Sequence, residues 1–222
     1  MSVLFAASTS NKEAFVHTIQ DLKAGYKKFR SGAYAEQTDL YRELGTGQDP
    51  DVMVISCADS RVEPAEIFAA TPGQLFVVRN VANLVHARNA DQTAHSVASA
   101  VEFAVTALKV KHIVVLGHAA CGGVKACLSA GNGQPIGEFI APWVEALDAT
   151  RDQVLASSPA DPQTALEHAG VGTSLDNLMS YAFVRDAVVA GALELHGAWF
   201  DIGPGELSWR DPKTGEFSLF DA

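Results

Sequence analysis

Three residues of metal-binding type follow two short apolar runs of the sequence. Cys57 ends the run 52–57, His118 ends the run 112–118, and Cys121 follows three residues later. A single buried cysteine is usually a small hydrophobe, but two thiolates with an imidazole form a donor set that suits tetrahedral zinc. Three protein ligands leave a fourth position open, as in catalytic sites. The pattern therefore predicts one zinc ion per chain, held by Cys57, His118 and Cys121.

A carboxylate and a guanidinium group follow closely after the first cysteine. Asp59 and Arg61 are two residues apart and can form a bidentate ion pair. On an ordinary surface such a pair contributes little to stability. Beside zinc it has a use, because the arginine keeps the carboxylate ionised and off the metal. The carboxylate can then accept a hydrogen bond from zinc-bound water or hydroxide and orient the nucleophile.

Two glycines, Gly122 and Gly123, follow Cys121 and begin a predicted helix. They allow the backbone to pass close to the metal, and the free N–H groups at the start of the helix can hold an anion. Cys127 lies just under two helical turns beyond Cys121, and we expect it to pack in the core.

The apolar runs determine the fold class that we expect. Short continuous runs rich in β-branched residues are typical of strands buried on both faces of a parallel sheet. Helical patterns alternate with them, which predicts an α/β fold with a mostly parallel central sheet flanked by helices. Side chains that follow such strands gather at one edge of the sheet, so the Cys57 and His118 motifs meet there. The predicted strands are 52–57, 74–80, 112–118 and 195–202, and the predicted helices include 92–108 and 174–193.

The two ends of the chain have their own patterns. Residues 11–45 form a predicted N-terminal helical arm, with apolar residues at spacings of three and four and a second helical stretch over 35–44. At the other end, 206–210 turns through 211–215 and returns as a predicted β-hairpin. The loop over 157–162 is too short for a domain boundary, so residues 1–222 are predicted to form a single domain.

Composition narrows the class of protein. The chain has 222 residues, of which 48% are hydrophobic and 19% are charged, as expected for a globular protein. A net charge of −10 without a basic stretch argues against a nucleic-acid partner. No apolar run approaches the ~20 residues that span a bilayer, and the first residues make a poor signal peptide. The small, odd number of cysteines, three, is typical of a reducing compartment, in which thiols stay free or bind metal. We therefore expect a cytoplasmic protein with no membrane partner.

The two ligand motifs together resemble the paired signature of the β-class carbonic anhydrases. These motifs are Cys57-Ala-Asp-Ser-Arg61 and His118-Ala-Ala-Cys121-Gly-Gly, and the likeness extends from about Lys27 to Trp209. The resemblance implies that Cys57, His118 and Cys121 bind zinc and that Asp59 and Arg61 form the catalytic dyad. The family usually has serine where this chain has Ala58, a difference that touches neither ligand nor dyad.

The resemblance also points to a branch of the family. A bicarbonate-regulated branch has tryptophan three residues before the first cysteine, where this chain has Val54. The plant-like, non-switching branch has glutamine nine residues before it, which here is Gln48. By resemblance to that branch, Gln48, Phe76, Phe103 and Gly122 contact the substrate. Gln48 and Phe103 reach the site from a partner subunit, which implies a homodimer or a larger homo-oligomer. Phe103 lacks the hydroxyl of the tyrosine usual at its position.

The implied reaction is the reversible hydration of carbon dioxide to bicarbonate and a proton. Zinc-bound hydroxide attacks carbon dioxide in a small apolar pocket, and Asp59 orients the nucleophile. In acid, Asp59 is also expected to be a conditional fourth zinc ligand. Two alternatives stay open from the residues: a related zinc hydrolase acting on carbon disulfide, and a zinc protein that binds bicarbonate without turnover. The intact Asp59–Arg61 pair argues against a protein that only binds bicarbonate. The shape of the access tunnel distinguishes a carbon disulfide hydrolase from a carbonic anhydrase.

Overall fold

The computed structural model describes residues 16, 18–89 and 96–220. The chain divides into two compact units, Met1–Gly47 and Gln48–Ala222. The prediction that all 222 residues form a single domain stays a prediction. Among the described residues, no helix combines the length and the apolar character needed to cross a membrane.

The first unit is helical in its described part. It contains α1 (Ile19–Ser31), α2 (Ala33–Glu36) and α3 (Thr38–Leu44). Thr18 caps α1 in a reciprocal arrangement, because its hydroxyl accepts the N–H of Asp21 and the Asp21 carboxylate accepts the N–H of Thr18. The predicted helical arm is thus present from α1 onward, while residues 11–15 and 17 lie outside the described part of the chain.

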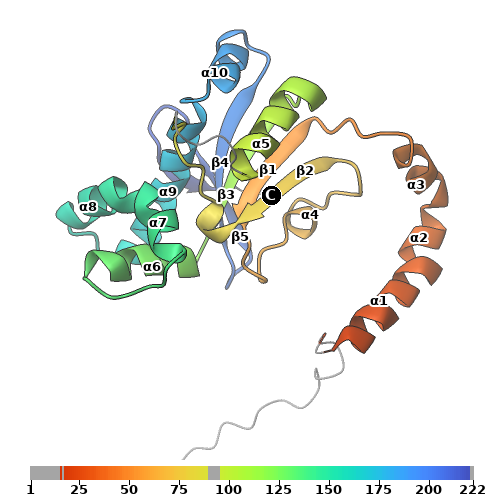
Figure 1. Cartoon of the computed structure of the whole chain (residues 1–222), viewed down its shortest axis with the longest axis horizontal. Helices are drawn as coiled ribbons and strands as arrows, with labels where there is room; N and C mark the ends of the chain where they lie inside the picture. Colours follow the sequence, from red (N-terminus) through yellow and green to blue (C-terminus); the bar gives the residue numbers. More distant parts are fainter. Residues whose placement is uncertain (1–15, 17, 90–95, 221–222) are drawn as a thin grey trace, which may run out of the picture. The chain divides into compact units, whose positions relative to one another are not determined.

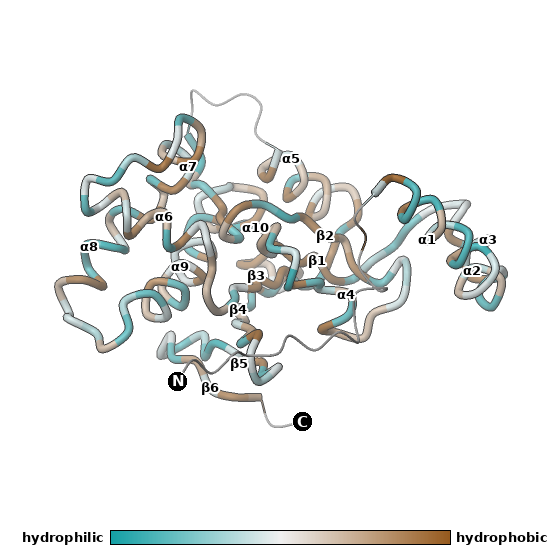
Figure 2. Tube along the Cα trace, turned by 90° about the horizontal axis from the view of Figure 1, so that it is seen from below, coloured by the Kyte–Doolittle hydropathy of each residue, from teal (hydrophilic) through white to brown (hydrophobic). Residues whose placement is uncertain are grey.

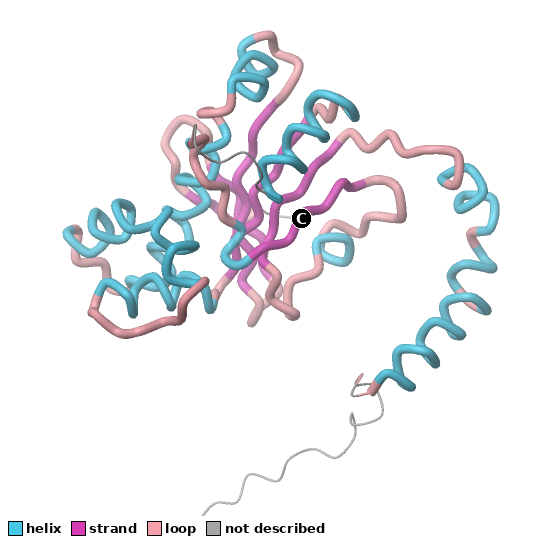
Figure 3. The backbone as a smooth tube through the Cα atoms, viewed as in Figure 1, coloured by secondary structure: helices cyan, strands magenta, loops and turns pink. Residues whose placement is uncertain are grey.

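The second unit is built on a sheet whose order, within the described residues, is β2-β1-β3-β4-β5-β6 (Figures 1 and 3). The first four strands in this order are parallel, and β5 and β6 are added antiparallel. The predicted α/β fold and the C-terminal hairpin are therefore confirmed. The strands are β1 (Val52–Cys57), β2 (Leu75–Asn80), β3 (His112–His118), β4 (Glu194–Asp201), β5 (Glu206–Arg210) and β6 (Phe217–Leu219).

The centre of the sheet forms the core. β1 and β3 are almost entirely buried, and hydrophobic residues are concentrated on these strands (Figure 2). The prediction that the run 74–80 is buried on both faces was wrong. Within the described residues, β2 is the edge strand of the sheet and pairs with β1 alone, so its residues are half-buried or exposed.

Helices cover one face of the sheet more thickly than the other. α5, α9 and α10 pack on the face that carries Met53, Ile55, Ile113 and Val115. Gly117 of β3 allows α9 to approach, because a Cβ there would lie 2.8 Å from the Val171 side chain. The helices of this unit are α4 (Pro64–Ile67), α5 (Ser96–Glu102), α6 (Gly122–Gly131), α7 (Ile140–Val144), α8 (Asp148–Ala156), α9 (Pro162–Leu178) and α10 (Ala182–Val189), with a π-helical segment over Phe103–Leu108 and 3-10 turns over Val81–Asn83 and Glu145–Leu147.

The helix predicted over 174–193 is in fact two helices. α9 begins at Pro162, with Asp161 as its cap, and ends at Leu178. Tyr181 then takes an extended conformation before α10 and is held by a hydrogen bond from its hydroxyl to the carbonyl oxygen of His86, at 3.0 Å. That long-range contact breaks the helix, and the local apolar pattern does not reveal it.

Candidate metal centre

The three predicted ligands meet at the carboxyl ends of the parallel strands. Cys57 ends β1, His118 ends β3, and Cys121 is the N-cap of α6. Their ligand atoms all lie within 4.8 Å of one another, and the two Sγ atoms are 3.9 Å apart. Two thiolates bound to one tetrahedral zinc at ~2.3 Å lie about 3.8 Å apart, so the spacing of the sulfurs fits this ion.

The protonation pattern of His118 leaves one nitrogen free for a metal. Its Nδ1 lies 2.9 Å from the carbonyl oxygen of Ala119, which makes Nδ1 the protonated donor. Nε2 then carries a lone pair, and it is buried without a hydrogen-bond partner among the described residues. A buried, unpartnered ring nitrogen beside two sulfurs fits a set of ligands for a metal ion.

The two cysteine sulfurs are in hydrogen-bond contact and shift each other's pKa. The hydrogen bond with Cys121 lowers the pKa of Cys57, and the Ala82 N–H also donates to the Cys57 sulfur, at 3.4 Å. The same interaction raises the pKa of Cys121, because its ionisation would place a second negative charge in the pair. A divalent cation removes this conflict by taking the place of the proton.

Arg79 holds the loop that carries the first cysteine. Its guanidinium donates to the carbonyl oxygens of Cys57 at 3.1 Å, Asp59 at 2.7 Å and Val62 at 2.7 Å, and it pairs with Glu63 at 2.7 Å. One side chain on β2 therefore fixes the backbone after β1. Arg79 was not among the predicted site residues, because its contacts with this loop depend on the pairing of β2 with β1.

The two glycines after Cys121 differ in their surroundings, and the close approach of this backbone to a metal stays a prediction. A Cβ at Gly123 would lie 2.6 Å from the Val81 side chain and 2.8 Å from that of Ala82. Gly123 thus allows the start of α6 to approach the turn after β2. A Cβ at Gly122 would meet nothing within 4 Å, so space alone does not require glycine there.

Asp59 and Arg61 form the bidentate pair beside the ligands. The Asp59 carboxylate accepts hydrogen bonds from Arg61 Nε at 2.9 Å and Nη2 at 2.7 Å, and from the Arg61 backbone N–H at 3.0 Å. These bonds hold the pKa of Asp59 well below its usual range. Arg61 also donates to the carbonyl oxygen of Ala120, and Asp59 Oδ2 lies 4.0 Å from His118 Nε2. The carboxylate is therefore ionised, fixed and turned toward the cluster.

A buried glutamate on α9 supports the second cysteine, and the sequence analysis missed it. Glu167 accepts hydrogen bonds from the Cys121 backbone N–H at 2.8 Å, from Gln163 at 2.6 Å and from Trp199 at 3.3 Å. Burial raises the pKa of Glu167, and these donors oppose that shift. Because Glu167 lies 46 residues beyond Cys121, no local motif signals the contact.

Replacing Glu167 by glutamine is expected to weaken zinc retention. The amide keeps one acceptor oxygen but turns an N–H group toward a donor, so the loop at Cys121 loses a fixed contact. Loss of an outer partner of a metal ligand typically costs about 10–100-fold in affinity. Zinc loss to a competing chelator measures this, with the exposed Glu145→Gln variant as control. Equal zinc retention in both variants would show that Glu167 does not position the ligand.

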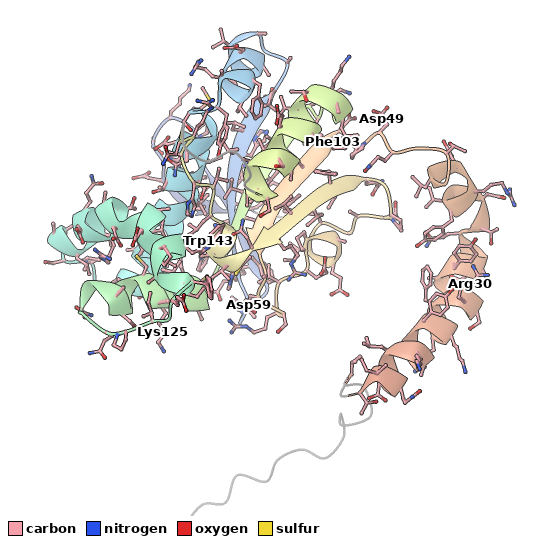
Figure 4. All side chains as sticks on the ribbon, viewed as in Figure 1. Arg30, Asp49, Asp59, Phe103, Lys125 and Trp143 are labelled. Atoms are coloured by element: carbon pink, nitrogen blue, oxygen red, sulfur yellow. The ribbon has the colours of Figure 1, made fainter. Side chains whose placement is uncertain are left out.

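Three of the predicted pocket residues, Gln48, Phe76 and Phe103, lie away from the ligands of their own chain, whereas Gly122 directly follows Cys121. Phe76 pairs in register with Met53, four residues before Cys57, and its ring centroid is 6.0 Å from that of Phe103. Figure 4 shows Phe103 and Asp59 at different ends of the sheet. Gln48 is exposed and precedes the start of β1. Contact of these residues with substrate stays a prediction.

Comparison with known proteins supports the family indicated by this geometry. A family model described as carbonic anhydrase matches residues 52–207. Beta carbonic anhydrase 3 of Arabidopsis thaliana is 36% identical over 214 residues, covering 92% of this chain and 81% of that protein. The chain belongs to the β-class carbonic anhydrase family.

Solved structures of β-carbonic anhydrases share the whole fold. That of the β-carbonic anhydrase CcaA superposes with a TM-score of 0.85 at 31% identity, covering 92% of each chain. A tetrameric β-carbonic anhydrase of Sordaria macrospora gives 0.71 at 31% identity, covering 90% of this chain and 94% of the other. The likeness thus extends over nearly the full length of β-carbonic anhydrase chains.

Proposed function

We propose that the protein catalyses the reversible hydration of carbon dioxide to bicarbonate and a proton, with zinc held by Cys57, His118 and Cys121. The observation that carries the proposal is the buried cysteine–histidine–cysteine cluster with a fixed carboxylate beside it, in a chain of the β-carbonic anhydrase family. Zinc in such a site lowers the pKa of a bound water molecule toward neutrality. Comparing hydration by the zinc-loaded and zinc-depleted chain tests the proposal.

Asp59 orients the nucleophile in this proposal. Its Oδ2 faces the cluster and would accept a hydrogen bond from a nucleophilic oxygen there, while the hydrogen bond from Arg61 keeps the carboxylate from turning away. Because Asp59 stays ionised, it does not compete for the proton that the reaction releases. In acid, the same carboxylate would be the residue able to hold the zinc as a conditional fourth ligand.

The substrate pocket is completed by a second subunit. Gln48 and Phe103 come from the partner, and Phe76, whose ring lies beside Phe103 in the same chain, adds an apolar ring. Gly122 leaves room at the start of α6. The separation of Phe103 from Asp59 within one chain supports this assignment (Figure 4). The exposed apolar side chains of α1, among them Ile19, Leu22 and Tyr26, are a further surface that association can bury.

The purified protein is expected to be a dimer or a larger homo-oligomer. Light scattering during gel filtration should give at least twice the chain mass of 23.5 kDa. Fully active protein that runs as a monomer would contradict the placement of Gln48 and Phe103 in a partner's pocket.

We assign the chain to the non-switching branch of the family. Val54 stands where the regulated branch has tryptophan, and it lines an apolar pocket together with Phe68 and Trp209. Valine offers neither an indole N–H nor a flat ring to hold bicarbonate. Gln48 is the residue that the non-switching branch has at its position.

Activity is expected to fall smoothly as the pH decreases, following a single one-proton transition. Without the tryptophan, no bicarbonate-bound closed state is stabilised, so Asp59 stays paired with Arg61 near neutral pH. Hydration rates measured from mildly acidic to alkaline pH, with and without added bicarbonate, test this. A steep transition of several protons that bicarbonate deepens would place the chain in the switching branch.

The compartment that fits these residues is the cytoplasm. All three cysteines are free thiols, and two of them must stay reduced to bind zinc.

A further inference from the structure

A second group of metal-binding side chains lies at the opposite end of the parallel strands, where β3 and β4 begin. His112 Nδ1 is 3.2 Å from His196 Nε2, and the Glu194 carboxylate oxygen Oε2 is 3.5 Å from each of these nitrogens. These three ligand atoms lie within 4.8 Å of one another. The reaction proposed above uses none of these residues.

The strand register explains why they meet. His112 is the first residue of β3 and pairs with Glu194, the first residue of β4, while His196 pairs with Val114. Side chains two residues apart on a strand point to the same face, so all three project from one face of two neighbouring strands. His118 is six residues further along β3, about 20 Å away at the usual rise per residue.

The distances fit a bound ion as well as they fit a hydrogen bond. Nitrogen and oxygen ligands at ~2.0–2.1 Å from a tetrahedral ion lie about 3.3 Å from one another. The three separations here are 3.2, 3.5 and 3.5 Å. Two imidazoles with one carboxylate form the donor set of several zinc enzymes, whereas calcium and magnesium prefer oxygen ligands alone.

The group is accessible to an ion. The side chains of His112, Glu194 and His196 are 40%, 67% and 28% exposed. Both imidazoles also line a pocket of about 290 Å³, whose other walls include Val54, Phe68 and Trp209. The face with this pocket is the one that the helices cover thinly. An ion can therefore reach the nitrogens without displacing core side chains.

We propose that His112, Glu194 and His196 form a second binding site for a divalent transition-metal ion. Zinc, copper and nickel are among the ions that imidazole ligands favour. Glu194 supplies the negative charge, and the two strands hold both rings at ligand spacing.

Zinc itself is the probe that tests the site. The full-length protein is dialysed against buffered free zinc, and bound metal is counted per chain. We expect the parent to bind a second equivalent and His196→Ala to bind only the first. Glu194→Gln should lower the affinity for the second zinc ion by at least ~10-fold, since even the loss of a residue that hydrogen-bonds to a metal ligand lowers metal affinity by about that factor. The control is Glu206→Gln, which removes a carboxylate from the first residue of the neighbouring strand β5 and should retain both equivalents.

Cobalt separates the two sites by their spectra. Cobalt added to the chain that already holds one zinc should give visible absorption without a thiolate-to-cobalt charge-transfer band. Cys57→Ser should lose the first equivalent and keep the second, so failure of the main site and failure of this one are distinguishable. A parent chain that saturates at one zinc, or a second equivalent that persists in His196→Ala, would overturn the proposal.

Discussion

Replacing Cys57 by serine is expected to remove zinc and to lower carbon dioxide hydration by about 10³-fold. A serine hydroxyl is not ionised at neutral pH, so the cluster loses one of its two thiolates and the negative charge that holds the cation. Loss of the metal removes several kcal/mol of transition-state stabilisation, and roughly 4 kcal/mol corresponds to that factor. Metal content and stopped-flow hydration, measured on the same preparation, check both parts.

Cys127 offers a matched control for this variant. It is a fully buried cysteine in the middle of α6, the helix that Cys121 precedes, but it is not part of the ligand cluster. Cys127→Ser should keep zinc and activity. If Cys57→Ser retained full zinc occupancy and the parent's rate, Cys57 would not be a ligand.

Replacing Asp59 by asparagine is expected to leave zinc bound but to lower hydration by about 10²–10⁴-fold, the range typical of a positioned acid–base group. Asparagine has one acceptor oxygen and no charge, whereas the Asp59 carboxylate accepts three hydrogen bonds from Arg61. The amide would also turn an N–H group either toward Arg61 or toward the cluster. Zinc analysis together with the hydration rate separates this effect from loss of the metal.

The control for Asp59→Asn is Asp39→Asn. Asp39 also pairs with an arginine, Arg42 at 2.6 Å, but in the N-terminal helical unit and with a fully solvated carboxylate. It should behave like the parent. An Asp59→Asn variant as fast as the parent would limit Asp59 to a structural role.

Where local pattern decides the structure, the sequence was sufficient. The predicted strands 52–57 and 112–118 have the same bounds as β1 and β3, because a short apolar run is the pattern typical of a strand buried in a parallel sheet. Since parallel strands end at one edge, the meeting of Cys57, His118 and Cys121 also followed from the pattern.

Where distant contacts decide, the sequence was not sufficient. The edge position of β2 depends on which strands pair with it, and the break before α10 depends on the contact of Tyr181 with His86. Glu167 supports Cys121 from another helix, and it looks like any glutamate in a helical pattern. The roles proposed for Gln48 and Phe103 would depend on a second subunit, which no pattern within one chain describes.

The most direct test of the central claim is stopped-flow hydration of carbon dioxide by the purified chain at several zinc occupancies. We expect a rate well above that of buffer, proportional to the zinc held by the Cys57–His118–Cys121 cluster and abolished when a chelator empties it. A chain with this site fully loaded that hydrates carbon dioxide no faster than buffer would contradict the account.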